Sequence, residues 1–105
     1  MLITTADAIP GREVAQTFGL VTANAVRARH VGRDILAGLK NIVGGDIGAY
    51  RQLLTESRRE ALDKLEAEAS AQGADAIVAL RLTTASIMGG AAEVLAYGTA
   101  VKLAP

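Results

Sequence analysis

The residues best placed to bind a ligand lie in a glycine-rich segment at residues 41–50. Gly44, Gly45 and Gly48 allow the backbone to turn tightly and to approach another group closely. Asp46 comes just before a long helical pattern, where its carboxylate can cap free N–H groups. Such a segment can bind an anion, but its spacing matches neither nucleotide-binding glycine motif, and Asp46 would repel a phosphate. We therefore favour a tight turn between two helices over a ligand-binding loop.

Charged residues cluster shortly before this segment. They are Arg27, Arg29, Arg33, Asp34 and Lys40. The cluster could hold an anion, because arginine recognises anionic groups well. It could also form a network of ion pairs between subunits. The residues alone do not separate the two interpretations, and we favour the second.

A metal site has few candidate ligands in this chain. His30 is the only histidine, and there is no cysteine, so disulfides and thiolate metal sites are excluded. A site at His30 would need carboxylates such as Asp34 or Asp46, supplied by folding or by a neighbouring subunit. The arginines that flank His30 would repel a metal ion. We favour a surface histidine at a junction between a strand and a helix.

Catalysis has weaker support than binding. Asp34 or Asp75 could act as a general base, but neither is accompanied by a second catalytic group or a cofactor motif. Asp75 follows Gly73, which favours a role in a turn. Glu56 and Glu60 have basic neighbours along a helical pattern, which is typical of a solvated face rather than of an acid–base pair.

The composition places these residues in one domain of 105 residues. Eleven Lys or Arg residues balance eleven Asp or Glu residues. A net charge of zero removes the usual electrostatic basis for binding nucleic acid or an anionic membrane. The N-terminus does not resemble a signal peptide, and no apolar run approaches the ~20 residues that span a bilayer. We expect a cytoplasmic protein that binds neither nucleic acid nor membrane.

Hydrophobic periodicity predicts an α+β fold with the element order ββααββ. The expected strands are residues 2–5, 13–27, 76–86 and 92–103, and the expected helices are residues 30–43 and 47–72. Alternation would place Phe18 and Leu20 on one face of the second strand, and Gly19 is a candidate bulge or bend. Gly73 is expected to end the long helix in the left-handed conformation, and residues 87–91 to form a hairpin loop.

Both faces of the two C-terminal strands are apolar. In the first of these strands, alternation places Val78 and Leu80 on one face and Ile77 on the other. In the second strand it places Tyr97 and Ala96 on opposite faces. An antiparallel sheet with one solvated face should instead alternate apolar with polar residues. Either the two helices cover opposite faces, or another subunit completes the sheet. We favour completion by another subunit.

Six short motifs follow one another along the chain. They begin at Gly19 (Gly-Leu-Val-Thr-Ala), Gly32 (Gly-Arg-Asp-Ile), Asn41 (Asn-Ile-Val-Gly-Gly), Gly48 (Gly-Ala-Tyr), Gly73 (Gly-Ala-Asp-Ala) and Gly98 (Gly-Thr-Ala-Val-Lys). In this order they resemble the uncharacterised YbjQ family, also called UPF0145, over essentially the whole chain. The resemblance implies a dodecin-like α+β subunit that assembles into a homopentameric ring with strands packed between subunits. It also implies heavy-metal binding, because the family carries that label.

These observations lead to two functional hypotheses. The first is a non-enzymatic ring assembly that binds a small ligand or metal ion between subunits. Its candidate ligand-binding residues are Arg33, Asp34, Gly44, Gly45, Asp46 and Tyr50. The alternative is a small carboxylate-dependent enzyme, such as a hydrolase, with Asp34 or Asp75 as general base. No cofactor is assigned in either case.

Overall fold

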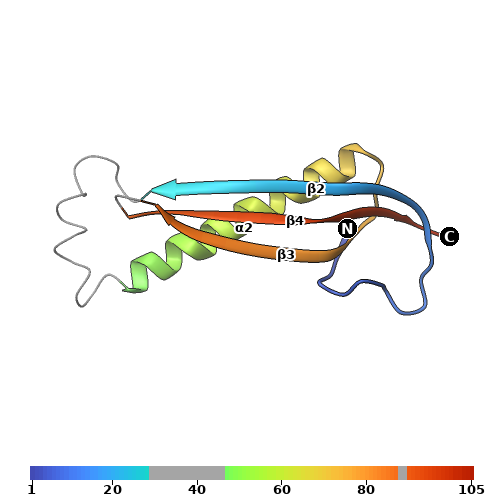
Figure 1. The fold of residues 1–105 in the computed structure, drawn as a ribbon, viewed down its shortest axis with the longest axis horizontal. Coiled ribbons are helices and arrows are strands. Elements are labelled where there is room, and N and C mark those ends of the chain that lie inside the picture. Colours follow the sequence, from blue (N-terminus) through green and yellow to red (C-terminus); the bar gives the residue numbers. More distant parts are fainter. Residues whose placement is uncertain (29–46, 88–89) are drawn as a thin grey trace.

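The computed structural model describes residues 1–28, 47–87 and 90–105. Its elements are β1 (Leu2–Ile3), β2 (Val14–Ala28), α2 (Ile47–Ala71), β3 (Ala76–Ile87) and β4 (Ala91–Leu103), as Figure 1 shows. These bounds confirm, to within a residue or two at each end, the elements predicted for the described ranges. The helix predicted at residues 30–43 and the glycine-rich turn before Ile47 lie outside the described residues.

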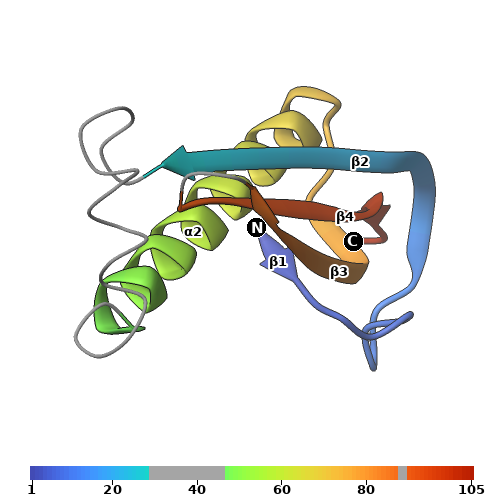
Figure 2. The ribbon, with the colours of Figure 1, turned by 60° about the vertical axis from the view of Figure 1, so that its left-hand side comes forward.

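The strands form one mixed sheet in the order β1-β3-β4-β2. β2 and β3 both run antiparallel to the central strand β4. β3 and β4 pair as far as Ile87 and Ala91, as the predicted hairpin requires. β1 instead runs parallel to β3, beside which it lies in Figure 2. The expectation of antiparallel strands therefore holds for the three long strands and is wrong for β1.

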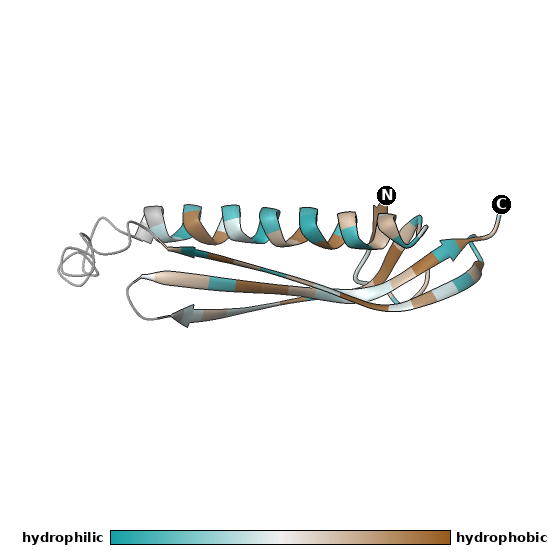
Figure 3. Ribbon diagram, turned by 90° about the horizontal axis from the view of Figure 1, so that it is seen from above, coloured by the Kyte–Doolittle hydropathy of each residue, from teal (hydrophilic) through white to brown (hydrophobic). Residues whose placement is uncertain are grey.

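α2 lies along one face of the sheet, as Figure 3 shows. Its buried residues recur at every fourth position, namely Leu53, Ser57, Ala61, Leu65 and Ala69. Most of these side chains are small, so the helix can approach the sheet closely and pack on residues such as Val21 and Val94. The Ser57 hydroxyl donates a hydrogen bond to the carbonyl of Leu53 at 2.8 Å, which satisfies the one buried polar side chain of this stripe.

Gly73 ends α2 as predicted. Its φ is 92°, in the left-handed region. The N–H of Gly73 donates to the carbonyl of Ser70, and the N–H of Ala74 donates to the carbonyl of Ala69. This pair of bonds is a Schellman motif, which satisfies carbonyls that the helix end would otherwise leave unpaired. No helix in the described ranges is long and apolar enough to cross a membrane.

The described strands contain three register shifts, and two of them, at Gly19 and Ala79, move large apolar side chains to a different face. The predicted bulge at Gly19 is confirmed by a register shift and a φ of 106°. Because of it Phe18 packs on the helix side with Val21, so the prediction that Phe18 and Leu20 share a face is wrong.

The second irregularity lies at Ala79 and was not predicted. Ala79 has a φ of 54°, and the β3 register shifts between Val78 and Arg81. Ile77 and Leu80 consequently both join the core under the helix, whereas Val78 joins a cluster on the opposite face. The prediction that Val78 and Leu80 share a face is therefore wrong.

Among the described residues, the sheet face away from α2 is covered at one end only. There Ile9, from the chain between β1 and β2, packs against Ala76, Val78, Val101 and Leu103. Farther along the same face Leu20 is 70% exposed, Val26 53% and Tyr97 38%. Figure 3 shows α2 on the other side of the sheet, and no other described helix or strand lies over this face. We call the surface that carries Leu20, Val26 and Tyr97 the open face.

Candidate functional site

The structure places few of the predicted site residues. Arg33, Asp34, Gly44, Gly45 and Asp46 lie outside the described residues, as does His30. Of the candidate ligand-binding set only Tyr50 is described. Its hydroxyl shares a 2.9 Å hydrogen bond with the hydroxyl of Ser86. This bond joins the first turn of α2 to β3 and is a structural contact.

Asp75, the described candidate for a general base, is engaged with the backbone of β4. Its Oδ1 accepts a hydrogen bond from the N–H of Leu103 at 2.8 Å, and its own N–H donates to the carbonyl of Val101 at 3.0 Å. These bonds hold the start of β3 against the end of β4. The contacts agree with the structural role favoured from the sequence.

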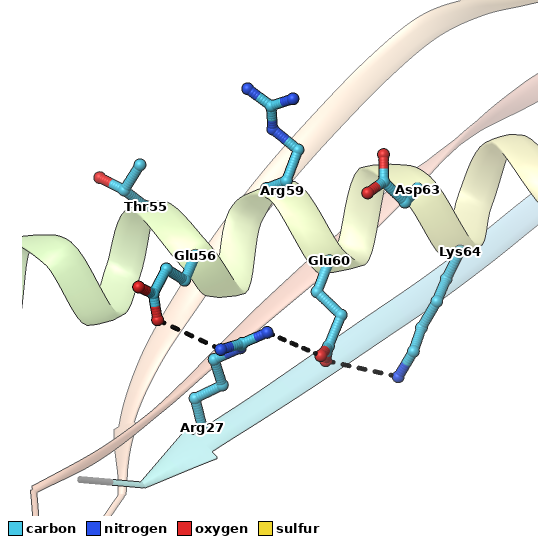
Figure 4. A pocket seen from close by; sticks show the side chains of 7 residues that line it. All are labelled: Arg27, Thr55, Glu56, Arg59, Glu60, Asp63 and Lys64. Carbon is cyan, nitrogen blue, oxygen red and sulfur yellow. Dashed lines mark hydrogen bonds and ion pairs between the residues drawn. The ribbon is translucent and has the colours of Figure 1, made fainter.

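The structure gathers a different set of charged side chains between α2 and β2. They line an open groove of about 550 Å³ and are Arg27, Thr55, Glu56, Arg59, Glu60, Asp63 and Lys64. Figure 4 shows Arg27 reaching from the end of β2 toward two carboxylates on successive turns of the helix. In the same view Arg59 points to the side of the helix opposite Arg27.

The ion pairs in this groove form a continuous chain. Arg27 Nη1 lies 3.2 Å from Glu56 Oε2, and Arg27 Nη2 lies 3.2 Å from Glu60 Oε1. Lys64 Nζ lies 3.5 Å from Glu60 Oε2 and also donates to the carbonyl of Asn24 at 3.3 Å. Helix and edge strand are thus connected at several points. We call the chain from Glu56 through Arg27 and Glu60 to Lys64 the ion-pair ladder.

The ladder is poorly suited to binding a metal or an anion. Three cationic and three anionic side chains line the groove, so no net charge attracts an ion. The carboxylates Glu56 and Glu60 already contact Arg27. Across the described ranges, no group of three or more His, Cys, Asp or Glu side chains could hold a metal ion. Sequence analysis assigned Glu56 and Glu60 to a solvated helix face; in the structure their side chains are 46% and 33% exposed, and both contact Arg27 of β2.

Sequence reasoning missed the partners of Arg27. The arginine was grouped with its neighbours at residues 29–40, whereas its partners come from α2, 29 and 33 residues away. A usable signal existed, because Glu56 and Glu60 are spaced i,i+4 and therefore share one side of the helix. Arg27 also has the same strand parity as Val21, which faces that helix.

The open face combines apolar, aromatic and polar groups in ordered rows. Thr22 of β2 and Arg81 of β3 both pair with Tyr97 of the central strand β4. In the next row on the same face, Asn24 of β2 and Thr83 of β3 both pair with Leu95 of β4. Arg81 Nη1 donates to the carbonyls of Thr5 and Leu80 at 3.0 and 2.8 Å. Tyrosine and arginine beside exposed aliphatic groups are typical of the centre of a protein–protein interface.

The chain is similar to known proteins over nearly its whole length. A family model described as "Putative heavy-metal-binding" matches residues 1–104. A UPF0145 protein of Photobacterium profundum is 59% identical over 98% of this chain and 99% of its own length. A UPF0145 protein of Archaeoglobus fulgidus is 57% identical over 98% of this chain and 95% of its own.

A solved structure has the same fold. It is a protein of unknown function of the DUF74 family from Pediococcus pentosaceus, with a TM-score of 0.67 and 21% identity. The match covers 99% of this chain and 98% of the other. At this identity the similarity concerns the fold alone.

Proposed function

The chain belongs to the YbjQ family, also called UPF0145, and we propose that it is a non-enzymatic subunit of a homopentameric ring that binds a small ligand or metal ion between subunits. The observation that carries the assembly is the open face. Leu20, Val26 and Tyr97 remain exposed on it, although the opposite face of the same sheet is closed by α2. The number five rests on the family resemblance.

Energetics favour covering this face with protein. Fully burying a large apolar side chain contributes roughly 1.5–3 kcal/mol, and Leu20 and Tyr97 lie in neighbouring rows of this face. Contiguous apolar patches on soluble proteins commonly mark interaction sites. A second copy of the chain is always present at the concentration of the first, so it is the simplest partner for a permanent surface of this kind.

A ligand site between subunits would draw on the segment that joins Ala28 to Ile47. This segment contains Arg33, Asp34 and Asp46, as well as His30. The described carboxylates of the groove are occupied by cations of the same subunit, so a metal ion would need donors from this segment or from a neighbour. The hydrolase alternative gains no support from Asp75, because that carboxylate binds the backbone of Leu103.

Thermal unfolding across a ligand panel tests the binding part of the proposal. The panel contains divalent transition metals, nucleotides, inorganic phosphate and chelator-treated controls. A true ligand at 100 times its Kd should stabilise the native protein by about 2.7 kcal/mol. If no member of the panel raises the thermal midpoint at millimolar concentration, ligand binding is contradicted. The assembly is tested separately, by the mass of the particle in solution.

A further inference from the structure

The side of α2 that points away from the sheet carries a row of exposed residues at every fourth position. An α-helix has about 3.6 residues per turn, so positions two residues away from the buried stripe lie on the opposite side of the helix. We call these positions the outer row, which consists of Arg51, Thr55, Arg59, Asp63 and Ala67, all of them exposed. Figure 3 shows no described helix or strand above this side of α2.

Outside the ion-pair ladder, the charged residues of α2 separate by sign. The three basic residues all precede the three acidic ones, in the order Arg51, Arg58, Arg59, Asp63, Glu66 and Glu68. The helix dipole favours the reverse order. α2 has no acidic residue in its first turn and no basic residue in its last turn. Stabilisation of the helix itself therefore does not account for this order.

At the centre of the outer row, Arg59 and Asp63 have opposite charges but form no ion pair with each other. Glu60 and Lys64 have the same i,i+4 spacing and do form one, with 3.5 Å between Lys64 Nζ and Glu60 Oε2. Among the described residues no ion pair includes Arg59 or Asp63. Figure 4 shows both side chains on the side of the helix away from Arg27. The two charges thus face outward, where a partner can reach them.

The outer row is complementary to itself when its direction is reversed about position 61. Arg59 and Asp63 lie at equal distances from that position and have opposite charges. Thr55 and Ala67 also lie at equal distances from it and are both small. A second α2 placed antiparallel on the row would therefore bring each Arg59 beside the Asp63 of the other copy. The small pair would let the two helices approach closely.

The flanks of the outer row allow the same arrangement. On one flank Arg58 would face Glu66 of the other copy, which has the opposite charge. On the other flank Glu56 would face Glu68, but Arg27 Nη1 already lies 3.2 Å from Glu56 Oε2 within the subunit. The reversed arrangement is therefore attractive at the centre and on one flank, and the like charges of the other flank are partly neutralised.

We infer that the outer row of α2 binds the outer row of α2 in a second copy of this chain, antiparallel and about a two-fold axis. The contact is isologous, so the pair of Arg59 with Asp63 forms twice. α2 and the open face lie on opposite sides of the sheet, so this contact goes beyond the proposed ring and does not depend on it. Ion pairs between exposed side chains are weak and are screened by salt. The association is therefore reversible and favoured by low ionic strength.

Sedimentation velocity over a range of protein concentrations tests the contact. We call the particle present at micromolar concentration the basal unit, whether it is a ring or a single chain. The mass should rise above that of the basal unit at near-millimolar concentration in about 0.01 M salt, where the Debye length is ~30 Å. It should return to the basal unit in about 1 M salt, where that length is ~3 Å. A mass that stays constant with concentration at low salt would overturn the inference and leave the ring untouched.

Two single charge reversals test which residues pair. Arg59→Glu and Asp63→Arg each place like charges opposite each other twice, so each variant alone should remain the basal unit. An equimolar mixture of the two should associate as the wild type does, because the two reversed charges then face each other across the contact. Circular dichroism checks that both variants fold. A single variant that associates like the wild type, or a mixture that remains the basal unit, would overturn the inference.

Arg12→Glu is the control for net charge. Arg12 is exposed in the chain between β1 and β2, and its reversal changes the net charge by the same amount as Arg59→Glu. A mixture of Arg12→Glu with Asp63→Arg should therefore associate less than the mixture of Arg59→Glu with Asp63→Arg. Equal association of the two mixtures would show a general attraction between oppositely charged particles and would overturn the pairing through the outer row.

Discussion

At Gly98, the absence of a side chain allows the two C-terminal strands to pack closely. A Cβ at this position would lie 2.8 Å from Ile77 Cγ2 and 3.1 Å from the carbonyl oxygen of Val78. The crowding follows from the irregularity at Ala79, which turns both Ile77 and Leu80 toward the helix. Glycine is therefore needed here for space rather than for an unusual φ.

We predict that Gly98→Ala lowers the free energy of unfolding by roughly 1–3 kcal/mol, the typical cost of adding a methyl group to a well-packed region. Gly48→Ala is the matched control, because its Cβ would meet nothing within 4 Å and the residue lies in α2. The control should be neutral or slightly stabilising. Urea unfolding of both variants measures the difference, and equal stabilities would show that the strands can move apart without cost.

The left-handed Ala79 leads to a second prediction at the same scale. A non-glycine residue at a φ of 54° is strained by roughly 1–2 kcal/mol. Ala79→Gly removes this strain. It also increases the conformational entropy of the unfolded chain, which lowers the stability by up to about 1 kcal/mol. The net result should be a small gain in stability, seen as a higher thermal midpoint. A clear loss would mean that the Ala79 methyl group packs favourably.

Among the elements, the connection between α2 and β2 depends on both apolar packing and the ion-pair ladder. The apolar part could be read from the sequence, since Ala61, Leu65 and Ala69 mark one side of a helix. Gly73 and Gly19 could also be predicted, because glycine has a recognised role at helix ends and bulges. These local signals account for most of the confirmed fold.

What could not be predicted depends on contacts between distant residues. Alanine has no property that indicates a bulge at Ala79. The bulge arises where β3 forms hydrogen bonds with residues 4–6 on one side and lies close to Gly98 on the other. The parallel placement of β1 has no local signal either. The pairing of Arg27 with Glu56 and Glu60 likewise spans about 30 positions, as the two hydrogen bonds show. The segment with most of the candidate ligand residues lies outside the described residues, so those assignments stay predictions.

The ladder should make a modest, salt-dependent contribution to stability. The Arg27 side chain is 40% exposed, so solvent screening limits each ion pair to about 0–1 kcal/mol. We predict that Arg27→Ala lowers the free energy of unfolding more at low ionic strength than at 1 M salt. Arg59→Ala is the control, because Arg59 lines the same groove but is not part of the ladder and points away from Arg27 in Figure 4. A loss at Arg27 that does not depend on salt would instead indicate packing of its aliphatic stem.

Considered as a whole, the molecule is long and thin, with extents of 55 × 23 × 16 Å. Its thickness corresponds to a helix on a single sheet, since packed layers lie about 10 Å apart. Within the described ranges, α2 covers one face of the sheet, and Ile9 covers only one end of the other face. From the apolar pattern of β3 and β4 we predicted that such a sheet would need a partner subunit. The open face supports that expectation, and the ring remains our proposal.

We predict that a charge at the centre of the open face separates the subunits without unfolding them. Leu20→Lys is suitable, because Leu20 is 70% exposed in the single subunit and its replacement should change the stability of that subunit little. Thr55→Lys, on the exposed side of α2, is the control. Sedimentation velocity should show a smaller particle for Leu20→Lys only. A particle of unchanged size would exclude the open face from the interface.

The most direct test of the central claim is the mass of the native protein in solution, measured by light scattering coupled to gel filtration at micromolar concentration. Our account predicts a single species of about five times the 10.8 kDa chain mass. It also predicts that this species persists on dilution, since its interface would bury the open face. A monodisperse particle with the mass of one chain would contradict the account.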